Sequence, residues 1–303
     1  MSQPATPYRQ QQEKVNAYFH SQSSYWKDIY RGGSVQGAIY RTRLAAVLAW
    51  IDELSPGSGA RILEIGCGAG MLAVTLARRG LHVNAIDSTE AMIEQARRHA
   101  EDSGVTELLS LDVGDVYALD FEDASFDLVV AIGVIPWLAR PELAMREMAR
   151  VTRPGGHVIL TADNRLRLIY MFDPLMNPAL ATFRKRVKNI LERLRLIQQA
   201  PGATMETLHD RRLIDKFLAS AQLVKTRGMT IGFGPFSFLR FKFIPERSGV
   251  RLHHWIQRLA DRNVPILRYS GAQYLVMARK QASNLPGQST SEEGYASGTA
   301  KIP

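Results

Sequence analysis

The stretch ILEIGCGAG, residues 62–70, places three glycines at alternate positions directly after an apolar run. Ile62, Leu63 and Ile65 predict a buried strand, and the MLAVTLARRG that follows repeats its apolar residues at helical spacing. Glycine at a strand-to-helix turn lets the backbone reverse tightly and lets a ligand approach closely. The helix N-terminus adds free N–H groups and partial positive charge, so the sequence predicts that this turn meets a negative group of a ligand.

Two common glycine-rich turns do not fit this stretch. The dinucleotide-binding pattern Gly-x-Gly-x-x-Gly needs a small third residue, and Met71 stands at that position. A P-loop needs Gly-Lys-Ser or Gly-Lys-Thr at its end, which is absent. The pattern here is an acid, Glu64, followed by three alternate glycines and, at the end of the next predicted strand, a second acid, Asp87.

The composition is that of a soluble globular protein. The 303 residues are 46% hydrophobic and 22% charged, without an apolar run of 18 residues. The polar start of the chain lacks a signal-peptide core, and one cysteine, Cys67, excludes an internal disulfide and a zinc-thiolate cluster. We therefore expect a cytoplasmic protein. The net charge of +9 allows an anionic partner but identifies no site.

Strand and helix patterns alternate along the chain, which predicts an α/β fold with a mainly parallel sheet and helices on both faces. Helical patterns occupy 70–79, 89–102, 141–151 and 209–221. Seven runs predict strands: 61–65, 82–87, 107–113, 126–132, 157–162, 225–233 and 272–278.

Segments outside this repeating unit predict the domain organisation. The main domain covers residues 51–280, with insertions at 163–205 and 234–270. Residues 15–50 precede the first strand and predict lid helices, because extra segments beside the carboxyl ends of a parallel sheet usually complete a binding site. The polar ends, 1–14 and 281–303, predict disorder.

Four motifs resemble class I S-adenosylmethionine-dependent methyltransferases, in particular the small-molecule branch that contains the ubiquinone and menaquinone biosynthesis methyltransferases. In order they are LEIGCGAG, AIDSTEAMIEQAR, VGDVYALDFEDASFDLVVA and ARVTRPGGHVILT. The resemblance covers about residues 60–162 well and the remainder to 280 more loosely. It implies a Rossmann-like seven-stranded sheet with helices on both faces, an antiparallel last strand and lid insertions, with S-adenosylmethionine as the cofactor.

The resemblance also implies roles for individual residues. The methionine carboxylate would lie at the glycine turn, and Glu64 with the carbonyls near Ala131 and Ile132 would take the ammonium. Asp87 would accept both ribose hydroxyls, and Asp115 the adenine amine. Taken singly, both aspartates could instead be simple turn or cap residues, and Met92 plain core. The full set of predicted cofactor residues is Glu64, Gly66, Cys67, Gly68, Gly70, Asp87, Ser88, Met92, Asp115, Val116 and Ile132.

Aromatic residues outside the repeating unit predict an apolar or planar acceptor. The substrate-side candidates are Tyr25, Trp26, Tyr30 and Trp137. A second aromatic run, GFGPFSFLRFKF, carries Phe233, Phe236, Phe238, Phe241 and Phe243. This run and the N-terminal run that contains Tyr25, Trp26 and Tyr30 could equally be the hydrophobic core of a lid. No catalytic residue is identified, because methyl transfer from a sulfonium depends mainly on positioning. His20, Tyr30 and His209 are candidate bases by location only.

The run 179–198 predicts an amphipathic basic helix, with Phe183 and Val187 on one side and Arg184 and Lys185 largely on the other. Such a helix either lies on a membrane surface or packs on its own domain as a lid.

The function that this predicts is methyl transfer to a hydrophobic or aromatic small molecule, at oxygen before nitrogen or carbon. The alternatives are an RNA methyltransferase and a non-catalytic cofactor-binding scaffold. Gly133-Val-Ile-Pro-Trp137 replaces the Asn/Asp-Pro-Pro-aromatic motif of base-amine methyltransferases, and no RNA-binding module is recognisable, which argues against a nucleic-acid partner. Oligomeric state is left open.

Overall fold

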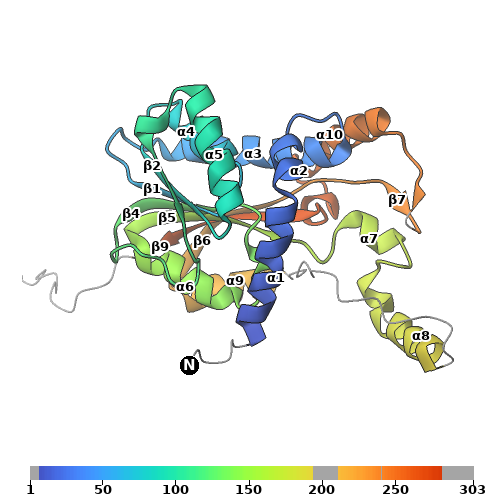
Figure 1. Cartoon of the computed structure of the whole chain (residues 1–303). Helices are drawn as coiled ribbons and strands as arrows, with labels where there is room; N and C mark the ends of the chain where they lie inside the picture. Colours follow the sequence, from blue (N-terminus) through green and yellow to red (C-terminus); the bar gives the residue numbers. More distant parts are fainter. Residues whose placement is uncertain (1–6, 194–210, 240, 282–303) are drawn as a thin grey trace, which may run out of the picture.

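The computed structural model of the chain describes residues 7–193, 211–239 and 241–281. A seven-stranded sheet in the order β3-β2-β1-β4-β5-β9-β6 forms the centre of the molecule (Figure 1). The first five strands in this order pair in parallel, and β9 pairs antiparallel with both β5 and β6. The strands are β1 (Ile62–Ile65), β2 (Val83–Asp87), β3 (Leu109–Val113), β4 (Phe126–Ala131), β5 (Thr152–Asp163), β6 (Leu223–Ile231) and β9 (Gln273–Lys280).

Helices cover both faces of this sheet (Figure 1). The helices are α1 (Pro7–Ser21), α2 (Ser23–Asp28), α3 (Val35–Leu54), α4 (Met71–Ala77), α5 (Glu90–Ser103), α6 (Pro141–Val151), α7 (Leu168–Phe172), α8 (Ala181–Arg193), α9 (Arg211–Ser220) and α10 (Glu246–Asp261). Short 3-10 turns lie at Thr106–Leu108, Ile135–Trp137, Pro178–Leu180 and Leu267–Tyr269. The predicted seven-stranded sheet with helices on both faces and an antiparallel last strand is confirmed.

Alternate residues of each strand feed two separate cores, as the two-residue period of a strand requires. In β1, Ile62 packs in a cluster with Trp50 of α3 and Leu76 of α4. Its neighbour Leu63 packs on the opposite face, in a cluster with Met145 of α6. Burial on both faces explains why the strands are almost continuously apolar in the sequence.

The register of the sheet determines where the functional site lies. Ile65 of β1 pairs with Ile86 of β2 on one side and Ala131 of β4 on the other. The residues that follow these three, Gly66, Asp87 and Ile132, therefore leave the sheet at one level. This is the carboxyl-end position at which open parallel sheets bind ligands.

The N-terminal segment corrects one prediction. Residues 7–14 form the first half of α1, although the sequence predicted disorder for residues 1–14. The glutamines, glutamate and lysine of this segment are good helix formers, and the helix is fixed by tertiary contacts such as the burial of Val15 (4% exposed). Residues 1–6 and 282–303 lie outside the described part of the chain.

The two insertions contain structure that periodicity did not predict in detail. A small hairpin, β7 (Ser237–Phe238) with β8 (Phe241–Lys242), stands apart from the main sheet (Figure 1). Phe233 and Phe236, which precede it, pack with Val35 of α3 and Ile256 of α10. The predicted helix over 179–198 corresponds to α8, and its last five positions lie outside the described residues.

Candidate functional site

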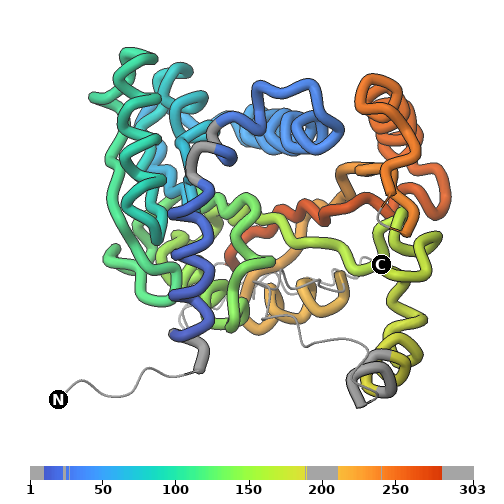
Figure 2. The backbone as a smooth tube through the Cα atoms, turned by 45° about the vertical axis from the view of Figure 1, so that its right-hand side comes forward, coloured from blue at the N-terminus to red at the C-terminus, as the bar shows by residue number. Residues whose placement is uncertain are grey.

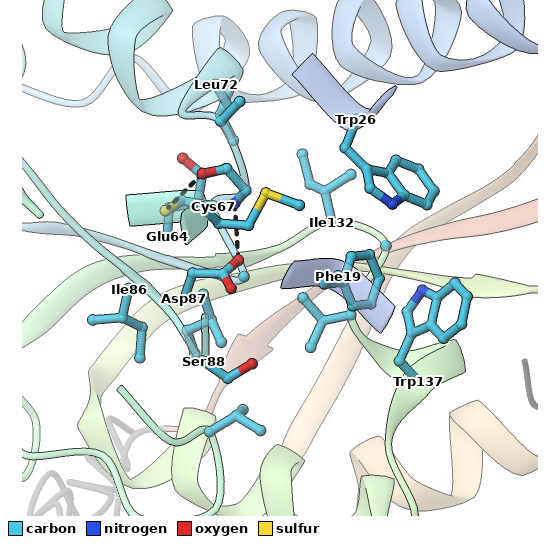
Figure 3. A pocket seen from close by; sticks show the side chains of 18 of the residues that line it. Phe19, Trp26, Glu64, Cys67, Leu72, Ile86, Asp87, Ser88, Ile132 and Trp137 are labelled. Carbon is cyan, nitrogen blue, oxygen red and sulfur yellow. Dashed lines mark hydrogen bonds between the residues drawn. The ribbon is translucent and has the colours of Figure 1, made fainter. Parts of the chain in front are cut away.

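A cavity of about 440 Å³ lies at the carboxyl ends of β1, β2 and β4, between the sheet and the first three helices. Acidic and polar groups gather at one end of it and aromatic rings at the other (Figure 3). Its volume is that of an ordinary small-molecule site. The helices α1 and α2 cross in front of the sheet here, as both backbone views show (Figures 1 and 2).

The N–H groups of the glycine turn bind mainly within the protein. The amides of Gly66 and Cys67 both donate to the Ile86 carbonyl, at 2.7 and 3.0 Å. The Gly68 amide donates to Asp87 Oδ2 at 3.0 Å. These hydrogen bonds tie β1 to β2 and orient the Asp87 carboxylate at the cavity. That the turn meets a negative group of the ligand stays a prediction.

A side chain at Gly66 or Gly70 would collide with a different neighbour in each case. Gly66 has a φ of +67°, and an added Cβ would lie 2.4 Å from Val134 Cγ2. Gly70, at the start of α4, has a φ of +75°, and an added Cβ would lie 3.1 Å from Ala96 of α5. Both conformations are ones that glycine adopts without strain. Gly70 does not line the cavity and packs closely against α5; its predicted contact with the cofactor stays a prediction.

Asp87 and Glu64 are two buried acids with different hydrogen bonds. Asp87 accepts from the amides of Gly68 and Thr89, each at 3.0 Å, while burial raises the pKa of its carboxyl. Glu64 is 4% exposed, and its Oε2 has no hydrogen-bond partner. Burial, opposed by a backbone hydrogen bond from Ala73 and reinforced by Asp87, raises the pKa of Glu64 to about 8. An unpartnered buried carboxyl oxygen fits a cationic ligand group.

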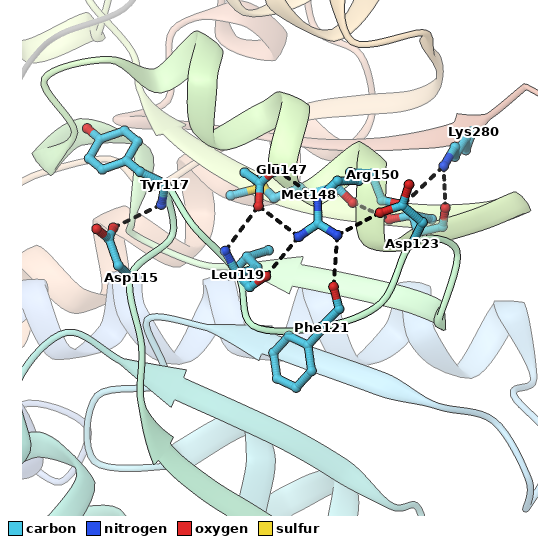
Figure 4. A network of polar contacts seen from close by, with 10 residues as sticks. Asp115, Tyr117, Leu119, Phe121, Asp123, Glu147, Met148, Arg150 and Lys280 are labelled. Carbon is cyan, nitrogen blue, oxygen red and sulfur yellow. Dashed lines mark hydrogen bonds and ion pairs between the residues drawn. The ribbon is translucent and has the colours of Figure 1, made fainter.

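The loop after β3 carries Asp115 and Val116 to the cavity edge. One Asp115 oxygen accepts from the Tyr117 amide at 2.9 Å, which forms a local turn. Arg150 of α6 fixes the loop from behind, because it donates to the carbonyls of Leu119 and Phe121 at 2.8 Å each (Figure 4). Arg150 also lowers the pKa of Glu147, which accepts from the Leu119 amide.

The other end of the cavity is aromatic. Phe19 of α1 lies edge-on to Trp137, with ring centroids 4.9 Å apart, and 5.5 Å from Trp26 of α2. Tyr18 stacks on Trp137 at 5.6 Å. A hydrogen bond from the Ser88 hydroxyl to Asn16 Oδ1 (3.0 Å) joins α1 to the end of β2. The N-terminal helices therefore form one wall of the cavity.

The structure separates the predicted site residues into two groups. Tyr25 is 51% exposed and, like Gly70, does not line the cavity; its place in the substrate wall stays a prediction. His20 is exposed at the end of α1, and His209 lies outside the described residues. The predicted residues that do line the cavity are Glu64, Gly66, Cys67, Gly68, Asp87, Ser88, Met92, Asp115, Val116, Ile132, Trp26, Tyr30 and Trp137.

None of the phenylalanines of the second aromatic run lines this cavity. Phe233 and Phe236 are buried in the core between α3 and α10, whereas Phe238, Phe241 and Phe243 are exposed. For Phe233 and Phe236 this packing corresponds to the alternative of a lid core; a contact between the exposed phenylalanines and an acceptor stays a prediction. Periodicity identifies the run as irregular and aromatic but does not say which side of the sheet it reaches.

Arg43 is a cavity residue that the sequence reasoning missed. It is 5% exposed and donates to Tyr30 Oη at 3.2 Å and to Gln273 Oε1 at 3.4 Å. Its guanidinium carbon lies 4.3 Å from the Tyr40 ring centroid, and its Nε has no hydrogen-bond partner. Among the described residues no carboxylate forms an ion pair with it. The sequence did hold a sign of this role, because Arg43 is a charged residue at a position on the apolar side of α3.

Asp163, also missed, ends β5 and lines the cavity. Its Oδ1 accepts from Gln273 Nε2 at 3.2 Å, and its Oδ2 lies 3.1 Å from Arg167 Nη2. It is 7% exposed. Like Asp87, it is a carboxylate directly at the end of a parallel strand, and that position was the signal in the sequence.

The raised pKa of Glu64 predicts opposite effects of Glu64→Gln on stability and on binding. The folded protein keeps the Glu64 proton up to about pH 8, whereas an unfolded chain loses it near 4.5. Raising the pH through this window therefore lowers the free energy of unfolding of the natural protein. Glu64→Gln should be about 2–4 kcal/mol more stable than the natural protein at pH 8 and similar at pH 5, yet bind a cationic cofactor more weakly.

Urea unfolding at both pH values and calorimetry with S-adenosylmethionine measure the two effects. Glu94→Gln, on the exposed face of α5, is the matched control and should show neither. A Glu64→Gln protein that is less stable than the natural one at pH 8 would contradict the assignment of an unpartnered buried carboxyl.

Comparison with known proteins gives a consistent family. The family described as "Methyltransferase domain" matches residues 63–160. A ubiquinone biosynthesis O-methyltransferase of Alkalilimnicola ehrlichii is 33% identical over 174 residues, which are 57% of this chain and 69% of that protein. One of Paracidovorax citrulli is 34% identical over 118 residues, 39% of this chain and 50% of that protein. The chain thus spans about half the length of several of these curated relatives.

A solved structure has the same fold. Magnesium protoporphyrin IX methyltransferase from Synechocystis, with bound SAH, superposes with a TM-score of 0.58 at 18% sequence identity. The match covers 89% of this chain and 100% of that one. At this identity the likeness concerns the fold. With the matched domain, the relatives and the buried acids at the strand ends, the protein belongs to the class I S-adenosylmethionine-dependent methyltransferases, and its cofactor is S-adenosylmethionine.

Proposed function

We propose that this methyltransferase acts on a hydroxyl oxygen of an aromatic or hydrophobic small molecule. Two observations support the proposal: Phe19, Trp26 and Trp137 form an aromatic part of the cavity wall, and the Asp163 carboxylate lines the same cavity. Aromatic walls select planar or apolar ligands, and one carboxylate among them suits an acceptor that carries a proton. The O-methyltransferase names of the curated relatives support oxygen as the acceptor atom.

The residues at the other end of the cavity fit the cofactor. Asp87 has acceptor capacity left after its two amide hydrogen bonds and would hold the ribose hydroxyls. Glu64, with its unpartnered Oε2, would take the ammonium. Ser88, Met92, Asp115 and Val116 line the part where the adenine would lie.

The methionine carboxylate would meet Arg43 rather than the amides of the glycine turn. Those of Gly66, Cys67 and Gly68 already have partners inside the protein, whereas Arg43 is buried with a free Nε and without a carboxylate among the described residues. A buried guanidinium without a counter-ion is costly, and a bound carboxylate removes that cost. Arg43 lies next to Gly133, where an added Cβ would come 3.0 Å from its Nη1, so it sits beside the end of β4.

The bound cofactor supplies a methyl group that its positive sulfur has already activated. The protein then has to position the acceptor, keep water out and receive a proton. The aromatic wall from α1 and α2 does the first two. We infer that an Asp163 oxygen receives the proton that the acceptor hydroxyl loses as the methyl–oxygen bond forms, while Gln273 and Arg167 hold the carboxylate in place.

Replacing Arg43 by glutamine should weaken the binding of S-adenosylhomocysteine by about tenfold to a hundredfold, because a charged hydrogen-bond donor to its carboxylate is lost. Binding of 5′-methylthioadenosine, which lacks that carboxylate, should change little. Calorimetry with both ligands makes the comparison. An equal loss for the two would mean that the substitution disturbs the cavity in general and that Arg43 does not hold the carboxylate.

A panel of acceptors tests the proposed reaction. Phenols, quinols and hydrophobic hydroxy acids should be methylated with labelled S-adenosylmethionine, and RNA, amino acids and small polar amines should not. Asp163→Asn should reduce turnover of the accepted phenols by about a hundredfold or more while cofactor affinity is kept. Preferential methylation of polar amines or RNA would overturn the proposal. Turnover unaffected by Asp163→Asn would remove Asp163 as the base.

A further inference from the structure

Exposed apolar side chains gather on two neighbouring segments at one end of the molecule. The first is the α7–α8 segment, where Phe172 is 72% exposed and Phe183 65%. The second is the β7–β8 hairpin, where Phe241 is 78% exposed and Phe243 60%. Their other exposed apolar members are Met171, Leu175, Met176, Leu180, Val187, Phe238 and Leu239. We call these two segments together the aromatic-basic surface.

The two segments form one surface because a buried acid joins them. Asp173, 2% exposed, accepts from the Leu239 amide of the hairpin at 3.1 Å and from the Leu175 amide at 2.8 Å. Both views place the hairpin beside α7, with α8 extending away from the body of the sheet (Figures 1 and 2). This end of the molecule is thus a projection. None of its exposed phenylalanines lines the cofactor cavity.

Positive charge accompanies the exposed phenylalanines. The sequence of α8, ATFRKRVKNILER, contains five basic residues and one acid. Lys185 and Arg186 are exposed, and Arg184 beside them is half-buried and donates to the carbonyls of Pro174 and Asn177. Lys242 lies between Phe241 and Phe243 on the hairpin and is paired with Glu246. A lid helix would bury its apolar side on its own domain, yet Phe183 and Val187 of α8 remain exposed (65% and 37%).

We propose that the aromatic-basic surface docks on an anionic phospholipid bilayer. Exposed apolar area of this extent marks an interaction site, and a bilayer accepts protruding phenylalanines without a shaped partner pocket. Anionic headgroups complement the adjacent lysine and arginine cluster. No helix among the described residues is long and apolar enough to cross a membrane, so the contact is peripheral. The proposal does not rest on the identity of the acceptor.

Vesicle flotation with the full chain tests it, using phosphatidylcholine alone and phosphatidylcholine mixed with phosphatidylglycerol. The natural protein should float with the mixed vesicles much more than with the neutral ones, and high salt should reduce this difference. The double variant Phe241→Ala/Phe243→Ala should partition at least about tenfold more weakly for each phenylalanine removed. The double variant Lys185→Glu/Arg186→Glu should lose at least about fivefold for each charge removed, on the mixed vesicles only.

Matched controls change similar residues elsewhere. Leu213→Ala/Val224→Ala removes two exposed apolar side chains from α9 and β6, and Arg98→Glu/Lys216→Glu makes the same change in net charge on α5 and α9. Both should float like the natural protein, and all variants should keep its cofactor affinity, which shows that they are folded.

Three results would overturn the proposal. The first is a natural protein that binds cofactor but does not float with anionic vesicles. The second is unchanged flotation of the phenylalanine and charge variants. The third is a natural dimer, seen by light scattering, that Phe241→Ala/Phe243→Ala converts to a monomer, since a second copy would then cover this surface. None of these results bears on methyl transfer.

Discussion

Asp87→Ala should weaken the binding of S-adenosylmethionine by roughly 3 kcal/mol or more, which is at least about a hundredfold in Kd. The carboxylate has two functions at this point. It accepts from the Gly68 and Thr89 amides, which shapes the glycine turn, and it presents its remaining acceptor sites to the cavity. Alanine removes both at once, and the Gly68 amide loses its partner.

Calorimetry on the folded variant measures this loss. Asp112→Ala is the matched control, because Asp112 belongs to the adjacent strand β3, near its carboxyl end, but is exposed and outside the cavity. It should bind the cofactor like the natural protein. Unchanged affinity in Asp87→Ala would remove Asp87 from the cofactor site.

Deleting residues 1–31 should abolish most turnover, by at least about a hundredfold in kcat/KM, while the sheet domain stays folded. The deletion removes Phe19 and Trp26 from the aromatic wall, and it removes Tyr30, a hydrogen-bond partner of Arg43. Among the described residues, the two sheet cores and the side chains packed against them begin at Leu44, and α3 keeps its cap, in which Ser34 accepts from the Gly37 amide. Because Asp87 and Glu64 remain, cofactor affinity should fall by no more than about tenfold.

Circular dichroism, calorimetry and turnover on the same preparation distinguish loss of the wall from loss of the fold. A pair of point variants gives a finer comparison. Trp26→Ala should lower turnover strongly, whereas Tyr25→Ala, one residue earlier but 51% exposed, should not. Normal turnover by the truncated chain would show that the acceptor site lies elsewhere.

The sheet could be predicted because its signals are local. Each parallel strand is buried on both faces and so is a short apolar run, and turn residues mark its ends. The positions of Glu64, Asp87 and Asp115 at strand ends also follow from the sequence, since parallel strands bring their carboxyl ends to one edge. The family motifs then named the ligand that these acids would meet.

The acceptor end could not be predicted because it depends on contacts between distant segments. Phe236 and Phe241 are five residues apart in one aromatic run, yet the first packs against Val35 and the second is exposed. Tyr25 and Trp26 are adjacent, but only Trp26 turns toward the cavity. In the sequence Arg43 is one charged residue in a long predicted helix, and only the structure shows its hydrogen bonds to Tyr30 and Gln273. The sequence pattern identifies such residues as aromatic or charged, but it does not show whether their side chains point into the cavity, into a core or into solvent.

A crystal structure of the protein with S-adenosylhomocysteine tests the site assignment most directly. We expect both ribose hydroxyls within hydrogen-bond distance of the Asp87 carboxylate, the amino group near Glu64 and the carboxylate of the ligand on the Arg43 guanidinium. The sulfur should then point toward the space bounded by Trp26, Trp137 and Asp163. A ligand whose carboxylate binds the amides of the glycine turn, with Arg43 uninvolved, would contradict this assignment.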